Sequence, residues 1–257
     1  MVNLRELTDF LHTVAPLYLA EDYDNVGLII ENDKDCAESV LISLDTDQDV
    51  VKEAKEKGCD LVISHHPLIF KPLKKITKKD CVFSLIKENI ALYAMHTNYD
   101  SVKGGLCDVL LSKVGEFENV LSLTGDEPDA IGRIAELKKE TTFKAFAENI
   151  KSVLGICNLR VVGDLNKKIK TVAVCNGGGA DFVYDAFSKG ADVYISGDFK
   201  YHHARFAYEN DMPLIEITHY DAEILFIDAI EKLLKEKFGD KLKIYKSQEN
   251  INVWKTV

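Results

Sequence analysis

Short apolar runs alternate with longer amphipathic stretches along most of the chain. The apolar runs, which we expect to form strands, are 40–44, 61–64, 91–95, 171–175, 193–196 and 213–217. The stretches in which apolar residues recur with helical spacing are 47–57, 81–89, 181–189, 201–210 and 222–238. Regular alternation of strands and helices is typical of α/β proteins. The pattern therefore predicts an α/β fold.

One strand–helix–strand unit occurs twice in the sequence. Residues 40–64 align without gaps on residues 172–196, at a constant offset of 132. Both segments read as strand, loop, helix, glycine turn and strand, and Asp60 falls on Asp192. Chance similarity between two units of this common kind is the alternative. The ungapped register favours an internal duplication.

The similarity extends to a third strand in each copy. The strand is followed by a histidine and, four residues later, by a carboxylate, so that His96 and Asp100 correspond to His219 and Glu223. The duplication therefore predicts two related α/β halves.

The boundary between the halves is expected in the segment 115–132, which contains Gly, Asp and Pro. This gives a first half at 1–125 and a second half at 126–257, with no inserted middle domain. An additional α/β stretch at 133–162 belongs to the second half alone.

The composition places the chain among ordinary globular proteins. Of its 257 residues, 46% are hydrophobic and 29% charged. No apolar run approaches the roughly 20 residues that span a bilayer, and the acidic N-terminal segment lacks a signal core. We therefore expect a cytoplasmic protein without a membrane partner. His12 lies on the expected N-terminal helix and is interpreted as structural or surface-exposed.

The net charge and the cysteine spacing argue against nucleic-acid-binding proteins and against sites built on Cys-x-x-Cys pairs. A net charge of −10 argues against a nucleic-acid partner, because such proteins usually carry a basic face. An anionic substrate would need a local positive charge, for which a bound metal is the obvious source. The five lysines of segment 70–80 are interpreted as a solvated loop. The six cysteines form no Cys-x-x-Cys pair, so we expect reduced, structural thiols.

Histidines follow the expected strands at the positions where α/β sheets bind ligands. His65 and His66 follow strand 61–64, His96 follows strand 91–95, and His219 follows strand 213–217. Imidazole and carboxylate ligands suit Zn, Mn, Fe, Co or Ni. A pair of adjacent histidines is often structural. Here its position predicts a metal site in the cleft between the two halves.

The spacing also indicates how many ions bind. Adjacent side chains of an extended backbone point apart, so His65 and His66 would each hold a different ion, with a carboxylate bridging the two. His219 and Glu223 can face one ion if a helix begins near Asp221. The sequence thus predicts a dinuclear site.

Two further segments carry candidate chemistry. The glycine loop at 175–181 could cradle a substrate phosphate with the amides of Gly177 and Gly178 at a helix N-terminus. The alternative is a tight turn with Asp181 as helix cap.

The second segment is "GDFKYHHA" (197–204), which offers Lys200, His202 and His203. These residues could contact a substrate anion or act as acid and base. Packing at the start of a helix, or surface exposure, is the alternative.

The chain resembles the GTP cyclohydrolase 1 type 2, or Nif-three-like, family over nearly its full length. The motifs that carry the resemblance are "EDYDNVGL" (21–28), "SHHPLIF" (64–70), "HTNYD" (96–100), "SGDFKYHHA" (196–204), "HYDAE" (219–223) and the C-terminal "WK". The resemblance implies a duplicated α/β fold, two divalent metal ions and a ring-shaped homohexamer. Carried over residue by residue, the implied metal ligands are His65, His66, Asp100, His219 and Glu223.

The family name implies hydrolytic opening of the guanine imidazole ring of GTP, with release of formate. In such a reaction His96, which is outside the ligand set, or His202 would shuttle protons, and Lys200, Gly177 and Gly178 would contact the substrate. Two alternatives stay open on the same residues. The protein could hydrolyse a phosphoester or another nucleotide, or it could be a metal-binding or metal-handling oligomer without turnover.

Overall fold

The computed structural model describes residues 1–125, 127–249 and 252–255, and the chain forms two compact units. The first unit comprises Met1–Tyr99 and Phe226–Val257, and the second comprises Asp100–Leu225. Both contain strands and helices, as predicted for an α/β chain. These units differ from the predicted halves 1–125 and 126–257, and Asp126 itself lies outside the described residues.

The difference arises at both ends of the second unit. The last strand, β13 (Lys243–Lys246), pairs in parallel with β4 (Ser39–Ser43), so the C-terminal segment belongs to the first unit. The segment 115–132, where the boundary was expected, contains a strand, β7 (Phe117–Ser122), which pairs with β8 (Arg133–Thr142) of the second unit. Residues before 126 therefore complete the second sheet.

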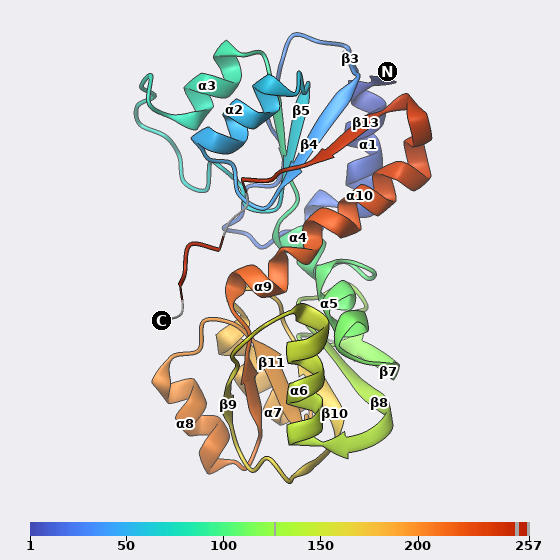
Figure 1. Cartoon of the computed structure of the whole chain (residues 1–257), viewed down its shortest axis with the longest axis vertical. Coiled ribbons are helices and arrows are strands. Elements are labelled where there is room, and N and C mark those ends of the chain that lie inside the picture. The colour runs from blue at the N-terminus through green and yellow to red at the C-terminus, as the bar shows by residue number, and fades with distance from the viewer. Residues whose placement is uncertain (126, 250–251, 256–257) are drawn as a thin grey trace. The chain divides into compact units, whose positions relative to one another are not determined.

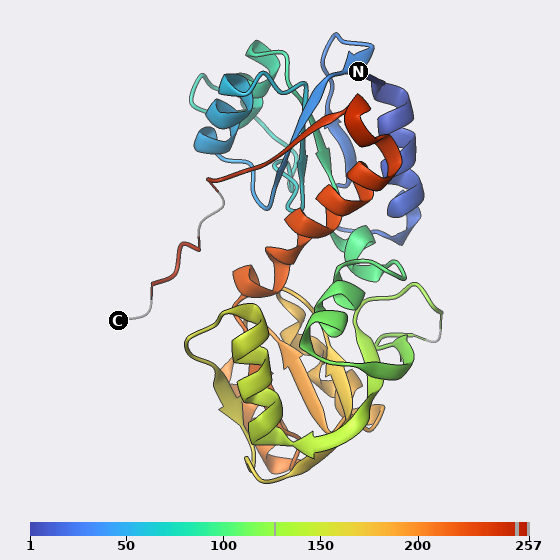
Figure 2. The ribbon, with the colours of Figure 1, turned by 45° about the vertical axis from the view of Figure 1, so that its right-hand side comes forward.

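The first unit is built on a five-stranded sheet of order β13-β4-β5-β6-β2. The strands β13, β4, β5 (Leu61–Ser64) and β6 (Ala91–Ala94) are parallel, and β2 (Gly27–Ile30) is an antiparallel edge. Its helices are α1 (Leu4–Val14), α2 (Gln48–Glu56), α3 (Cys81–Lys87) and α10 (Leu225–Phe238). Figures 1 and 2 show α2 and α3 on one face of the sheet and α1 and α10 on the other. Shorter elements are β1 (Val2–Asn3), η1 (Leu17–Leu19), β3 (Cys36–Ala37), α4 (Thr97–Ser101) and η3 (Gly239–Lys241).

The second unit is built on a six-stranded sheet of order β7-β8-β10-β11-β12-β9. Its centre consists of three parallel strands, β10 (Lys168–Val174), β11 (Val193–Ser196) and β12 (Leu214–Glu216). The strands β8 and β9 (Arg160–Val162) are antiparallel to their neighbours. The helices are α5 (Leu106–Val114), α6 (Phe143–Leu154), η2 (Gly179–Phe182), α7 (Val183–Ser188), α8 (Tyr201–Glu209) and α9 (His219–Glu223).

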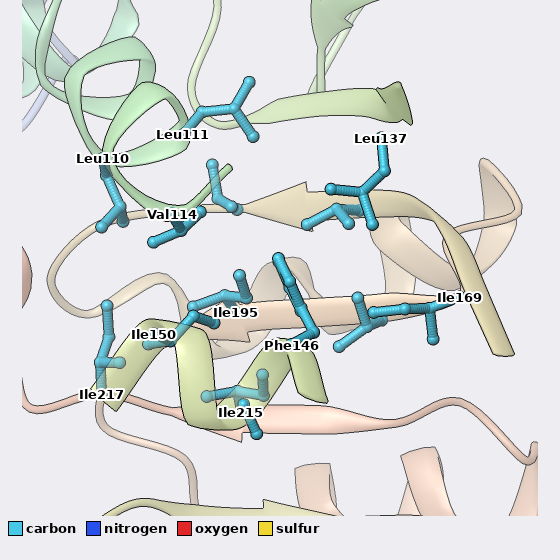
Figure 3. Packing of buried hydrophobic residues seen from close by; sticks show 14 of the residues in the cluster. Leu110, Leu111, Val114, Leu137, Phe146, Ile150, Ile169, Ile195, Ile215 and Ile217 are labelled. Atoms are coloured by element: carbon cyan, nitrogen blue, oxygen red, sulfur yellow. The ribbon is translucent and has the colours of Figure 1, made fainter. Parts of the chain in front are cut away.

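The central strands of the second unit are buried on both faces. Successive strand residues point to opposite faces, so Val193 and Ile195 pack with α5 and α6 while Tyr194 packs with α7 and α8. Figure 3 shows the first of these clusters, in which Phe146 and Ile150 of α6 lie against the sheet. Helices on both faces explain why these strands read as continuous apolar runs.

The two aligned segments share local hydrogen bonds. The carboxylate of Asp60 accepts from the amides of Glu38 and Ser39, and the carboxylate of Asp192 accepts from the amides of Lys170 and Thr171. Asp60 therefore fastens the beginning of β4, whereas Asp192 fastens β10 next to its register shift between Ile169 and Thr171. The glycines that precede these aspartates also agree, with φ +64° at Gly58 and +76° at Gly190.

Asp60 makes the stability of the first unit dependent on pH. Its burial raises the pKa of the carboxyl, but the hydrogen bonds from Lys34 and two amides outweigh burial and lower the pKa below its usual value. A carboxyl with a lowered pKa stabilises the folded state above about pH 4, and this contribution is lost as the pH falls through the folded-state pKa. We expect Asp60→Asn to lower the melting temperature at pH 6, with a smaller difference from wild type below about pH 3.

Thermal unfolding between pH 2.5 and 7 tests this dependence. The matched control is Asp240→Asn, in an exposed 3-10 turn of the same unit. A difference between wild type and Asp60→Asn that stays constant across this range would contradict the role assigned to the charge.

The sequence predicts no membrane-spanning segment, and the helices of the structure can be compared with this prediction. Among the described residues, none of the helices combines the length and apolar character needed to cross a bilayer.

Candidate metal centre

Three histidines cluster at the ends of two parallel strands in the first unit. The strand β5 ends at Ser64 and β6 at Ala94, and His65, His66 and His96 follow as the sequence predicts. One ring nitrogen from each histidine lies within 4.8 Å of the others. Ring nitrogens this close together could hold a metal ion.

The Nδ1 atoms of the adjacent histidines each face an acceptor. In His65, which is fully buried, Nδ1 lies 2.7 Å from the carbonyl oxygen of Met95. In His66, Nδ1 lies 2.8 Å from a carboxylate oxygen of Asp45. An imidazole that donates through Nδ1 presents a lone pair at Nε2 in its neutral form. Both rings are thus oriented as metal ligands usually are.

His96 is fixed in the same way by a carboxylate. Its Nδ1 lies 2.9 Å from Asp24 Oδ1, while Asp24 also accepts hydrogen bonds from the amide and hydroxyl of Thr97. Burial tends to raise the pKa of Asp24, but the hydrogen bonds from His96 and Thr97 prevail and lower it to about 2. Asp24 is therefore a carboxylate at neutral pH and can accept a hydrogen bond from His96 Nδ1.

In the second unit, α9 presents a histidine and a glutamate on one face. The sequence required a helix that begins near Asp221, and the structure has one: Thr218 caps it and α9 begins at His219. One turn brings His219 Nε2 to 3.0 Å from Glu223 Oε2, and the other ring nitrogen lies 2.8 Å from Asp198 Oδ2. Between Nε2 and a buried carboxylate, either a proton or a metal ion is the favourable occupant.

Asp100 is a second buried carboxylate of this unit. Its Oδ1 accepts a hydrogen bond of 2.8 Å from the side-chain amide of Asn176, whose own oxygen accepts from Cys107 Sγ at 2.6 Å. The pKa of the nearby Cys175 thiol is raised by its hydrogen bond with Cys107, by burial and by the negative charges of Asp100 and Glu223. The two carboxylates therefore create a local negative potential of the kind that attracts cations.

The glycine loop supports the His219–Glu223 pair. Gly177 has φ +58°, and a side chain there would overlap Glu223 Oε1 and lie 3.2 Å from His219 Nε2. The alternative in which Asp181 caps a helix is wrong, because neither η2 nor α7 has a side-chain cap and Asp181 accepts from His203 instead. Contact of Gly177 and Gly178 with a substrate stays a prediction.

The two adjacent histidines at the start of α8 differ in burial. His203 is buried, accepts from the amide of Lys200 through Nδ1 at 3.1 Å and faces Asp181 with Nε2 at 2.9 Å. Both of its nitrogens are therefore occupied in packing the start of the helix. His202 is exposed, with its ring centroid 4.0 Å from that of His203, and Lys200 is exposed as well. Acid–base chemistry at His202 stays a prediction.

Four partners of these residues were missed by sequence reasoning: Asp24, Asp45, Asn176 and Asp198. Asp45, Asn176 and Asp198 share a signal, because each lies two residues beyond the end of a parallel strand. A polar residue at this position is directed towards the ligand-binding edge of a sheet.

Known proteins with the same pattern identify the family. The family model for Duf34/NIF3 (NGG1p interacting factor 3) matches residues 2–252. The chain belongs to this family. A relative from Clostridium perfringens, named "GTP cyclohydrolase 1 type 2 homolog", is 37% identical over 96% of this chain and 97% of its own length.

Solved structures show the same fold. A hypothetical protein from Staphylococcus aureus superposes with a TM-score of 0.91 at 29% identity, covering 100% of this chain and 99% of its own. A Bacillus cereus protein related to NIF3 gives a TM-score of 0.89 at 26% identity, with 99% of each chain covered. The Duf34/NIF3 resemblance inferred from the sequence motifs is thus confirmed.

Proposed function

We propose that this Duf34/NIF3 protein is a hydrolase that depends on two divalent metal ions. The proposed ligands are His65, His66, Asp100, His219 and Glu223. The observation that carries the proposal is the shared orientation of the three histidines, each of which places Nδ1 against a carbonyl or carboxylate acceptor. A bond from Nδ1 to such an acceptor fixes the ring, and the Nε2 lone pair would then be the ligand atom for a metal ion.

The donor set fits a pair of transition-metal ions. Imidazole nitrogens and carboxylate oxygens suit Zn, Mn, Fe, Co or Ni, and the thiols of Cys107 and Cys175 interact with Asn176. Five protein ligands for two ions leave coordination positions for water and substrate, as catalytic sites require. A purely structural site would be closed.

The residues of the chain divide the work of a hydrolysis. When bound, the two ions would lower the pKa of a water molecule towards 7 and stabilise negative charge. Release of formate consumes two waters, one that opens the ring to a formamide and one that hydrolyses this formamide. In each step His96, held by Asp24, would accept the proton of the attacking water and return it to the leaving nitrogen. His202 is the alternative acid–base group, because its ring is exposed and could exchange protons with solvent water.

The proposed reaction is hydrolytic opening of the guanine imidazole ring of GTP with release of formate. Its support is the name of the relative from Clostridium perfringens, taken together with a site suited to activating water. Contacts of Lys200, Gly177 and Gly178 with the substrate, assembly as a homohexamer and a cytoplasmic location are parts of the same proposal.

Formate release from GTP tests the reaction. Protein reconstituted with two equivalents of Mn or Zn should release formate, and His66→Ala should abolish release and lower the bound metal from two ions to about one. Metal content is measured by mass spectrometry on the same samples. His202→Ala is the control, because it should retain both ions whatever its effect on turnover. A fully metal-loaded protein that releases no formate would exclude the ring-opening reaction, leaving a phosphoesterase or a metal-handling protein.

We further propose that the two sheets arose by duplication. Three consecutive parallel strands, β4-β5-β6 and β10-β11-β12, are flanked in each unit by an antiparallel strand beside the third. The matching hydrogen bonds of Asp60 and Asp192 support this origin.

A further inference from the structure

Two loops of the first unit are fastened together beside His96. The segment 21–25 contains Asp24, which bonds His96, and Asn25, whose side-chain amide donates to the carbonyl of Ile69 at 2.6 Å. Through these bonds, the loop before β2 is held against the loop that follows the adjacent histidines. The arrangement is therefore built into the fold of the unit.

The same two loops expose a pair of aromatic rings. Tyr23 and Phe70 have ring centroids 6.0 Å apart and planes inclined at 55°. Tyr23 is 62% exposed and Phe70 44% exposed, although large apolar rings normally gain by burial. The Phe70 ring lies 6.4 Å from that of His96, nearly perpendicular to it. An aromatic surface thus adjoins a proposed acid–base residue.

We propose that Tyr23 and Phe70 form a stacking platform for a planar ring of the substrate. This inference rests on the proposed function and names residues that select its substrate. Flat heteroaromatic rings stack on aromatic side chains irrespective of their hydrogen-bonding edges. The inclination of 55° excludes a parallel sandwich, so one ring supplies a face and the other an edge. The bonds of Asp24 to His96 and of Asn25 to Ile69 keep the two rings next to His96.

The residues after Phe70 indicate that the ring carries an anionic group. Phe70 leads directly into five exposed lysines, which are Lys71, Lys74, Lys75, Lys78 and Lys79. In a chain of net charge −10, this local excess of positive charge attracts anions. A nucleotide combines the two features, with its base on the platform and its phosphates towards the lysines.

The test is the affinity for nucleotides of variants that keep or remove the ring. Binding of GTP, ATP and UTP to the full-length, metal-analysed protein is measured by calorimetry. Phe70→Ala should raise the dissociation constant about tenfold, whereas Phe70→Tyr, which keeps the ring, should change it less than twofold. Tyr23→Ala and Tyr23→Phe form a second such pair. Tyr208→Ala, at an exposed tyrosine of the other unit, is the control and should bind as wild type.

The outcomes separate this inference from the proposed function. Ring-dependent nucleotide binding without formate release would support the platform and exclude the ring-opening reaction. Wild-type affinity in both alanine variants, or no binding of any of the three nucleotides to the wild-type protein, would overturn the platform whatever the metal content. A change of sedimentation mass in the alanine variants, with nucleotide affinity unchanged, would assign the two rings to a subunit interface instead.

Discussion

Replacement of Arg133 by methionine is expected to lower the free energy of unfolding of the second unit by about 3–5 kcal/mol. Arg133 is only 2% exposed, although arginine is rarely buried unless it is fully paired. Its Nε donates to Asp108 at 2.8 Å. Methionine fills a similar volume but offers none of these donors.

The cost comes from the groups that Arg133 satisfies. Its guanidinium also donates to four carbonyl oxygens, those of Ser101, Val102, Ala130 and Gly132. One side chain thus connects the C-terminal end of α4 to the turn before β8. Removing it leaves a carboxylate and several partly buried carbonyls without their donor, and each unsatisfied group carries a desolvation penalty.

Hydrogen exchange in urea measures the effect within the second unit alone. A single equilibrium transition is not assured in a chain with two units, so peptides from β10 and β11 are the appropriate reporters. Arg205→Met is the matched control. Its ion pair with Glu209, at 2.6 Å, is exposed and should contribute little to stability. Equal losses in the two variants would show that burial of Arg133 adds nothing.

Strands that are buried on both faces were predictable, because they appear in the sequence as continuous apolar runs. The parallel strands β4, β5, β10 and β11 are covered on both faces, so their apolar runs stood out and their positions match the expected ranges to within a few residues. The edge strand β7 was missed because its residues 118–121 are exposed and begin with the polar Glu118 and Asn119, so the segment was interpreted as a boundary between halves.

The division of the chain could not be read from local patterns. The pairing of β13 with β4 joins residues that are about 200 positions apart, and no periodicity reports such a partner. The aspartates that orient the histidines pose the same problem. Asp24 lies 72 residues from His96, and Asp45 lies 21 residues from His66. The histidines themselves were found because strand ends are local features.

Gly177→Ala is expected to remove one metal ion while leaving the protein folded. The nearest obstacle to a Cβ at this position is the carboxylate end of Glu223, which can move away at little cost to packing. Moving it withdraws a proposed ligand from the face that it shares with His219. We expect the affinity of one ion to fall about 10- to 100-fold, the range typical of a disturbed ligand shell.

Gly190→Ala separates this effect from backbone strain. Both glycines have positive φ, +58° at Gly177 and +76° at Gly190, but a Cβ at Gly190 meets no atom within 4 Å. Each variant should therefore lose about 1–2 kcal/mol of stability from the left-handed backbone. Only Gly177→Ala should also lose metal, which mass spectrometry of the dialysed proteins would detect.

The comparison also distinguishes two uses of the glycine loop. If Gly177 serves only to bind a phosphate through its amide, alanine would weaken nucleotide binding and leave the metal content of Gly177→Ala and Gly190→Ala equal. If the loop instead needs a glycine to leave room for Glu223, Gly177→Ala should contain less metal than Gly190→Ala. The overlap with Glu223 Oε1 and the short approach to His219 Nε2 favour the second use. On that basis, the absence of a side chain at Gly177 is itself a requirement of the proposed metal centre.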